Sequence, residues 1–281
     1  MSIAVRNLTK RYGKVAAVEE ISITLEREKI YGLLGRNGAG KTTLMNLMCD
    51  RIRPSAGTMT VEGRPLYNNA GRIYMMTEEN LYPESMRVHE VFRWTGEFYG
   101  GFDQEFADHL CREFDLDTKK KIGTLSTGYK SIYKLIAALC VDADYIFLDE
   151  PVLGLDAGHR ELFYKSLLET YSKNPRTFLV STHLIEEVAG VIEDVIIIDK
   201  GRLLRTDSVE NLLQSGYNIT GAIAAVDTYC RGREVLGSDI VGGIKTAAIL
   251  GKATDIPAGL TVSPLDLQKL FIRMTEKKEG K

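Results

Sequence analysis

The chain has 281 residues, of which 44% are hydrophobic and 26% are charged, as in a typical soluble globular protein. Its 36 Lys and Arg residues nearly balance 38 Asp and Glu residues, which leaves a formal net charge of −2. This balance argues against a protein that binds nucleic acid or anionic lipid through its overall charge, although a local basic patch is not excluded.

The first 63 residues favour strands around one helix. Residues 3–35 are predicted as strands: 21–25 alternates apolar and polar side chains, and 29–34 is almost continuously apolar, as in a strand covered on both faces. The Leu- and Met-rich segment 41–50 predicts a helix, and 58–61 predicts a further strand between two turns.

From about residue 82 to residue 141 the apolar spacing becomes helical. One helical face consists of Val88, Val91, Phe92 and Thr95. The pair Gly100 and Gly101 is expected to end this helix, and Asp103 is placed to cap the next one. A second stripe at helical spacing consists of Ile132, Leu135, Ile136 and Leu139.

Strands and helices then alternate. Strands are predicted at 145–148, 177–180 and 194–199, with a helix at 162–171, and this order implies a parallel sheet covered by helices. After residue 207 the composition shifts. Residues 217–263 predict short strands, 264–274 predicts a helix, and the tail at 276–281 is expected to fray.

Targeting, membrane and disulfide signals are not apparent. No apolar run approaches the ~18–20 residues of a membrane-spanning helix, and the first residues lack the apolar core of a signal peptide. The four cysteines show neither metal-site nor disulfide-framework spacing, so reduced and mostly buried thiols are expected.

The segment at 35–42, Gly-Arg-Asn-Gly-Ala-Gly-Lys-Thr, fits the phosphate-loop pattern G-x-x-x-x-G-K-[ST] between a strand and a helix. Gly38 and Gly40 let the backbone curl so that its N–H groups, together with the helix N-terminus, face phosphate oxygens. Lys41 would reach the β- and γ-phosphates, and the Thr42 hydroxyl would ligate Mg²⁺. The predicted nucleotide contacts in this loop are Gly35, Arg36, Asn37, Gly38, Ala39, Gly40, Lys41, Thr42 and Thr43.

A second motif, Tyr-Ile-Phe-Leu-Asp-Glu at 145–150, is an apolar strand that ends in two carboxylates. A buried parallel strand would place Asp149 at the carboxyl edge of the sheet, beside the phosphate loop, where it can hold the Mg²⁺ shell. Glu150 could then polarise a water molecule toward the γ-phosphate. Without the phosphate loop, the same pair would more simply be a solvated turn.

Together these motifs resemble the nucleotide-binding subunit of ATP-binding cassette (ABC) transporters over nearly all of residues 1–206. The segment Leu-Ser-Thr-Gly-Tyr at 125–129 resembles the family signature Leu-Ser-Gly-Gly-Gln. The loop at 150–156 resembles the one that carries the dimer-contact aspartate, here Asp156, and Ser-Thr-His at 181–183 resembles the segment of the switch histidine, here His183. Tyr12 lies where the family stacks an aromatic ring on adenine.

The resemblance implies an α/β fold, the P-loop NTPase ABC cassette. Its expected parts are an antiparallel β subdomain, a parallel-sheet core, a helical signature subdomain at about 82–142, and a small C-terminal α+β extension at 207–281. Two such subunits would face head to tail around ATP. Ser126 and Gly128 of one subunit would then meet the γ-phosphate held by Lys41 of the other. His183 would contact the γ-phosphate and help to hold Glu150, and Asp156 would couple the two sites.

Two departures from the family pattern stand out. The signature contains Thr127 and Tyr129, where the family has glycine and glutamine. The family also carries a glutamine that ligates Mg²⁺ after the strand leading into the helical subdomain, and here Thr77 takes its place with Glu78 adjacent. Either oxygen could be the substitute, and a carboxylate would add negative charge near the γ-phosphate.

The end of the chain resembles the tail of ABC-2-type exporters, which implies an ATPase that drives export through separate membrane permease subunits. The permease would dock near residues 82–98, and the chain would lie in the cytoplasm on the inner face of the membrane. No nucleic-acid partner is expected, and the second cassette could be identical or different. The alternatives are a nucleotide-sensing subunit with weak hydrolysis and a soluble ABC protein that acts on ribosomes or DNA.

Overall fold

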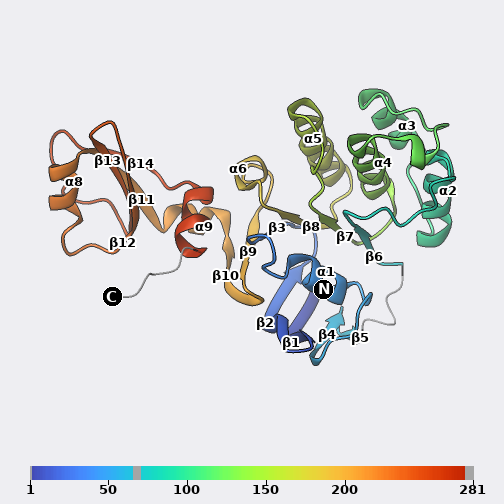
Figure 1. The fold of residues 1–281 in the computed structure, drawn as a ribbon, viewed down its shortest axis with the longest axis horizontal. Coiled ribbons are helices and arrows are strands. Elements are labelled where there is room, and N and C mark those ends of the chain that lie inside the picture. The colour runs from blue at the N-terminus through green and yellow to red at the C-terminus, as the bar shows by residue number, and fades with distance from the viewer. Residues whose placement is uncertain (1, 66–70, 276–281) are drawn as a thin grey trace.

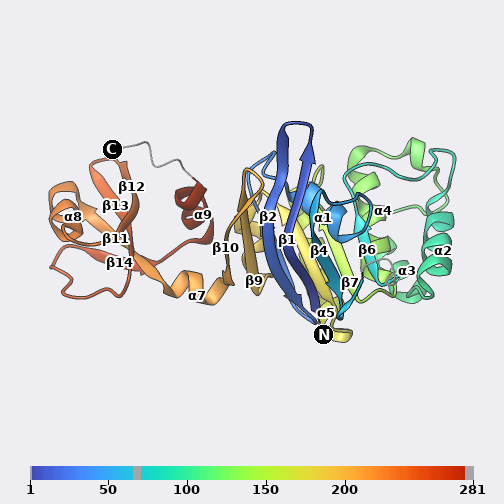
Figure 2. The same cartoon turned by 90° about the horizontal axis from the view of Figure 1, so that it is seen from below.

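The structure is a computed structural model that describes residues 2–65 and 71–275. Its three parts lie in a row: helices α2–α4 at one end, a six-stranded sheet in the middle, and a small sheet with α8 at the other end (Figure 1). A view from below shows strands β1 and β2 running alongside the middle sheet (Figure 2).

The middle sheet has the strand order β10-β9-β3-β8-β7-β6 and is parallel except for the β9–β10 pair. Its strands are β3 (Ile30–Leu34), β6 (Ile73–Met76), β7 (Tyr145–Asp149), β8 (Thr177–Thr182), β9 (Asp194–Asp199) and β10 (Arg202–Ser208). Every residue of β3, β7 and β8 is buried, which agrees with the parallel strands covered on both faces that their continuous apolar runs predict.

A second, antiparallel sheet has the order β2-β1-β4-β5. It consists of β1 (Ser2–Tyr12), β2 (Val15–Glu26), β4 (Ala56–Val61) and β5 (Arg64–Pro65). One buried cluster joins this sheet to helix α1 (Lys41–Met48) and to one face of the middle sheet. The segment between β3 and α1, which holds the phosphate-loop motif, therefore starts and ends at this packed region.

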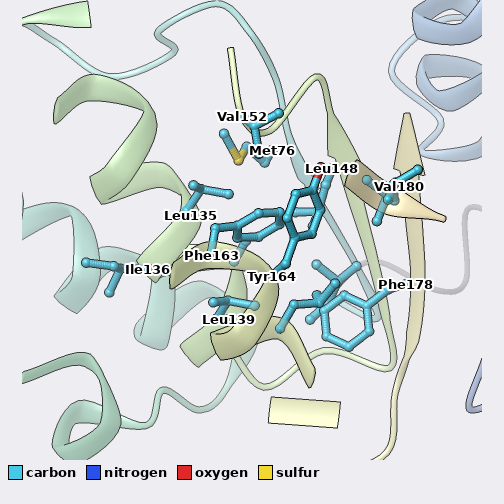
Figure 3. Packing of buried hydrophobic residues seen from close by; sticks show 14 of the residues in the cluster. Met76, Leu135, Ile136, Leu139, Leu148, Val152, Phe163, Tyr164, Phe178 and Val180 are labelled. Carbon is cyan, nitrogen blue, oxygen red and sulfur yellow. The ribbon is translucent and has the colours of Figure 1, made fainter. Parts of the chain in front are cut away.

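The other face of the middle sheet is covered by helices. They are α2 (Val88–Tyr99), α3 (Gln104–Glu113), the 3₁₀ turn η2 (Ile122–Thr124), α4 (Thr127–Cys140), α5 (Ala157–Lys173) and α6 (Ile185–Val188). All eight side chains of the two predicted helical faces are buried, and Gly100 ends α2 with a φ of 82°. Phe163, Leu135 and Leu139 of these helices pack against strand residues such as Leu148 and Phe178 (Figure 3).

Asp103 caps helix α3, as its sequence position predicts, because its carboxylate accepts the Phe106 backbone N–H at 2.9 Å. We expect Asp103→Ala to lower the free energy of unfolding by about 1 kcal/mol, because the Phe106 N–H would lose its acceptor. The melting temperature would fall by about 2 °C. Thermal denaturation of both proteins measures the effect. Glu113→Ala, at the opposite end of the same helix, is the control and should leave the melting temperature unchanged.

The C-terminal part is an antiparallel sheet, order β12-β13-β11-β14, with helices around it. Its elements are α7 (Val209–Gln214), β11 (Gly216–Ala222), α8 (Ile223–Cys230), β12 (Val235–Val241), β13 (Ile244–Leu250), β14 (Thr261–Pro264) and α9 (Leu267–Thr275). The sequence predicts only strands between 217 and 263, so helix α8 is a correction. Its buried residues, Val226 and Tyr229, lie three positions apart on one helical face and pack on the sheet.

Helix α9 packs back on the middle of the molecule. Leu267, Leu270 and Phe271 belong to the same buried cluster as Ile185 and Val188 of α6. The C-terminal part thus shares the main core of the protein in addition to its own small cluster around Tyr217 and Ile219.

The four cysteines are free thiols, and Cys111 and Cys140 are buried. Burial raises the pKa of Cys49 and of Cys111 to about 12, so both stay protonated at neutral pH. Within residues 2–65 and 71–275, no helix has both the length and the apolar character needed to cross a membrane. The predicted fraying of 276–281 lies outside the described residues.

Candidate active site

The phosphate loop lies between β3 and α1, and backbone contacts fix its shape. Gly40 has a φ of 104°, and a Cβ atom there would overlap the carbonyl oxygen of Ala17 in β2. The Gly201 N–H, from the turn before β10, donates to the Ala39 carbonyl at 2.9 Å. Only glycine fits position 40, because it alone tolerates both this φ and this close approach.

The loop forms one wall of a cavity of about 480 Å³. The lining residues are Ala17, Arg36, Asn37, Gly38, Ala39, Gly40, Lys41, Thr42, Thr43, Glu78, Glu150, Leu153 and His183. Segments from five separate parts of the sequence therefore meet at one site. The sequence analysis missed Ala17 and Leu153, which carry no polar signal, and both are brought to the cavity by the fold alone.

Lys41 begins helix α1 and is 6% exposed. Its Nζ atom donates to the Gly35 carbonyl at 2.8 Å and lies 3.4 Å from Oε1 of Glu150. A buried ammonium needs such partners, because its loss of hydration is otherwise uncompensated. The head group therefore lies inside the loop, close to the carboxylate at the end of β7.

Glu150 has a left-handed backbone with a φ of 46°, which is uncommon for a residue with a side chain. Its N–H donates to the Ser181 carbonyl of β8 at 2.9 Å, and this bond holds the turn after β7. The second carboxylate oxygen, Oε2, lies 2.9 Å from Nδ1 of His183. One carboxylate thus connects the loop lysine to the histidine after β8.

Asp149, the last residue of β7, is 2% exposed and directly precedes Glu150. Burial raises its pKa, and the neighbouring Thr42 and Ser181 hydroxyls oppose that rise. Its Oδ1 atom has no hydrogen-bond partner among the described residues. A buried carboxylate oxygen of this kind beside a hydroxyl fits a hard divalent cation such as Mg²⁺.

No group of three or more His, Cys, Asp or Glu side chains that could hold a metal ion occurs within 2–65 and 71–275. The oxygen donors beside the loop are the Asp149 carboxylate, the Thr42 hydroxyl and the Glu78 carboxylate. They suit Mg²⁺, which typically takes one or two protein ligands and completes its shell with phosphate and water oxygens.

Thr77 and Glu78 face different spaces. Glu78 lines the cavity at the phosphate loop, whereas Thr77 lines a neighbouring cavity between β6 and α2. The Thr77 hydroxyl donates to the Glu79 carbonyl at 3.1 Å and is thereby engaged. Of the two candidates that the sequence leaves open, Glu78 is the one at the phosphate loop.

An ABC transporter family model matches residues 18–153. The "Nod factor export ATP-binding protein I" of Burkholderia lata is 33% identical, covering 75% of this chain and 72% of the relative. The chain belongs to the ABC transporter family. The "ABC transporter ATP-binding protein NatA" of Bacillus subtilis is 29% identical over 72% of this chain and 85% of that protein.

A solved ATP-binding subunit of an ABC transporter shares the fold of this ABC protein. It aligns with a TM-score of 0.68 at 21% identity, over 76% of this chain and 92% of the solved one. The predicted P-loop ABC cassette is therefore confirmed, and the protein is an ATP-binding and ATP-hydrolysing subunit of an ABC transporter.

The signature segment of this ABC cassette begins α4, away from the cavity at the phosphate loop. Ser126 caps the helix by accepting the Tyr129 N–H at 3.3 Å. A Cβ atom on Gly128 would lie 2.9 Å from the Gly154 carbonyl oxygen, so this position needs glycine. The adjacent Thr127 is exposed and is accommodated without such a conflict.

Two further predicted residues of the cassette also lie apart from the cavity. Asp156 caps α5, where its carboxylate accepts the His159 N–H and contacts the His159 ring, each at 2.9 Å. Tyr12, at the end of β1, is half-exposed, and the Lys10 ammonium lies 5.1 Å from its ring centroid. Tyr12, Ser126, Gly128 and Asp156 are thus at the surface or beside it, and within one subunit they do not meet the phosphate loop.

Proposed function

We propose that this chain is the ATPase subunit of an exporter and that it hydrolyses ATP with Lys41, Glu150 and His183. The contact chain from the Lys41 ammonium through the Glu150 carboxylate to the His183 ring carries this proposal. It supplies a cation for the phosphates, a base for water and a polar partner for the γ-phosphate in one cavity.

Each of these three groups has a distinct task. The Lys41 ammonium leaves Glu150 and pairs with the β- and γ-phosphates when ATP binds, because the phosphate charge is larger. The freed Glu150 carboxylate orients and deprotonates the attacking water. His183 holds this carboxylate through Nδ1 and presents its other ring nitrogen to the γ-phosphate.

Thr42, Asp149 and Glu78 are the residues that would hold Mg²⁺ with the nucleotide. When bound, Mg²⁺ neutralises charge that develops on the β- and γ-phosphate oxygens. The unpartnered Oδ1 of Asp149 and the position of Glu78 in the cavity support this assignment. Thr77 is left out because it lines the other cavity.

We propose that ATP joins two cassettes, with Ser126 and Gly128 of one facing the nucleotide of the other and Asp156 at the contact. The exposed N-terminus of α4 supports this, because its N–H groups and the Ser126 hydroxyl can bind an anion that the same subunit cannot deliver. Exposed Tyr12 would stack on adenine. The cassette is assigned to 1–206 and the accessory region to 207–281.

The permease is proposed to dock on the cavity between β6 and α2, which has a volume of about 360 Å³. Its mouth carries the exposed side chains of Leu81, Trp94 and Phe98, and Phe98 is 71% exposed. Exposed aromatic side chains around an apolar hollow are typical of the anchoring pocket of a protein interface. Docking there would keep this chain at the inner face of the membrane.

Inside-out membrane vesicles that contain this chain and its permease test the proposal. An exporter should drive ATP-dependent uptake into such vesicles, as expected from its similarity to a Nod factor export protein. The Trp94→Ser, Phe98→Ser double variant should lower uptake at least 10-fold, because it removes two anchors worth about 2 kcal/mol or more. Its affinity for ATP should not change.

Val241→Ser is the matched control, since Val241 is an equally exposed apolar residue in the accessory region. It should leave uptake unchanged. Uptake that survives the double variant would rule out docking at α2, and uptake only into right-side-out vesicles would rule out export.

A further inference from the structure

Lys134 is a charged residue on the buried side of helix α4, and it is only 7% exposed. Its neighbours Tyr133 and Leu135 are fully buried. The Nζ atom donates to the Thr77 carbonyl at 2.8 Å and to the Glu78 carbonyl at 2.7 Å. Burial lowers the pKa of Lys134, and the nearby Glu78 carboxylate opposes that change.

An apolar side chain would fill this position at lower cost, because a buried ammonium must recover its lost hydration from protein groups. Lys134 therefore contributes through the specific backbone groups that it contacts. It fixes two successive carbonyls of the segment that leaves β6, and these carbonyls need such a partner because they lie outside the hydrogen-bond ladder of the sheet. Tyr133 adds a hydrogen bond from its hydroxyl to Oδ1 of Asn80 at 2.7 Å in the same segment.

The fixed segment lies between two cavities. Lys134 and Thr77 line the cavity at α2, whereas Glu78 lines the cavity at the phosphate loop. A rotation of the 77–78 backbone would move the Glu78 side chain away from the phosphate loop. Because the ammonium holds both carbonyls, it sets the direction in which Glu78 points.

We propose that Lys134 is a positioning residue that holds the Thr77–Glu78 backbone so that the Glu78 carboxylate faces the bound metal and nucleotide. This rests on the proposed function, in which Glu78 contacts Mg²⁺. Lys134 also connects two other parts of the protein to the metal side of the ATP site. The first is α4, whose N-terminus carries the signature, and the second is the cavity proposed for the permease. Movement of either would act on Glu78 through Lys134.

The test measures the dissociation constant of a fluorescent ATP analogue with and without Mg²⁺. The ratio of the two constants reports how much Mg²⁺ strengthens binding, and it does not depend on hydrolysis. Glu78→Gln and Lys134→Met should each lower this ratio about 10-fold, as expected for the loss of a metal contact or of its support. The double variant should be no worse than Glu78→Gln, because Lys134 acts through Glu78.

Lys165→Met is the control, because it removes an exposed lysine of α5. It should not change the ratio. Lys134→Gln keeps an uncharged amide donor group and should give an intermediate ratio. It replaces Lys134→Met if that variant does not fold by its melting curve.

Three results would overturn the proposal. Effects of Lys134→Met and Glu78→Gln that add in the double variant would mean that Lys134 acts elsewhere. A wild-type ratio in Lys134→Met would mean that Glu78 holds its position unaided. In both cases the proposed ATPase function stands. The third result is a wild-type protein that binds the analogue equally well with and without Mg²⁺, and this result would argue against the proposed ATPase function as well.

Discussion

Glu150→Gln is expected to lower the rate of ATP hydrolysis by roughly 10²–10⁴-fold, the range for loss of a general base. The amide keeps the shape of the side chain and can still contact His183, but it cannot take a proton from water. ATP binding should persist, because Lys41 loses a competing partner in the empty site. The variant should therefore accumulate as a dimer with ATP.

Steady-state hydrolysis with Mg²⁺, and the molar mass in ATP measured by light scattering, test both halves of this expectation. Glu161→Gln, an exposed residue of α5, is the control and should behave as wild type. A Glu150→Gln protein that still hydrolyses ATP would reject Glu150 as the base. A wild type that binds ATP but neither hydrolyses it nor dimerises would instead favour the sensing alternative or a need for a different partner cassette.

Lys41→Met is expected to weaken ATP binding by about 100-fold, since a charge-assisted hydrogen bond to phosphate contributes about 3 kcal/mol. The effect has a second source. Without the ammonium 3.4 Å away, the Glu150 carboxylate stays in the cavity as an unbalanced negative charge that repels the γ-phosphate. Hydrolysis should be lost along with binding.

Titration with a fluorescent ATP analogue measures this loss. Adding Glu150→Gln to Lys41→Met should recover part of the affinity, because it removes the repelling charge. Lys14→Met, in the exposed turn between β1 and β2, is the control for loss of a positive charge. If the double variant binds no better than Lys41→Met, the Glu150 charge does not contribute to the loss.

Much of this fold follows from local patterns. The phosphate loop was predictable because its glycines and lysine are consecutive in the sequence, and its position follows from the strand and helix around it. The buried face of α4 was predictable because Ile132, Leu135, Ile136 and Leu139 recur at helical spacing. The roles of individual site residues stay predictions, although the structure brings Lys41, Glu150 and His183 together.

Other features depend on contacts that leave no local pattern. In the sequence, Lys134 looks like a solvated helix residue. Its partners are backbone carbonyls 57 and 56 residues earlier, and they leave no sequence signal because every residue has a backbone carbonyl. Thr77 and Glu78 could not be separated, since only the three-dimensional path of the chain shows which cavity each one faces. Helix α8 was missed because its Val- and Thr-containing sequence also suits a strand.

The packing of α9 on α6 has a consequence for how the chain folds during synthesis. Leu270 and Phe271 fill the same core as strands and helices made much earlier, so that core stays open on one side until they leave the ribosome. A nascent chain that ends after β10 would expose Ile185 and Val188 to water and to other chains. Premature termination in the accessory region should therefore yield aggregation-prone chains, even though such chains already contain the whole phosphate loop.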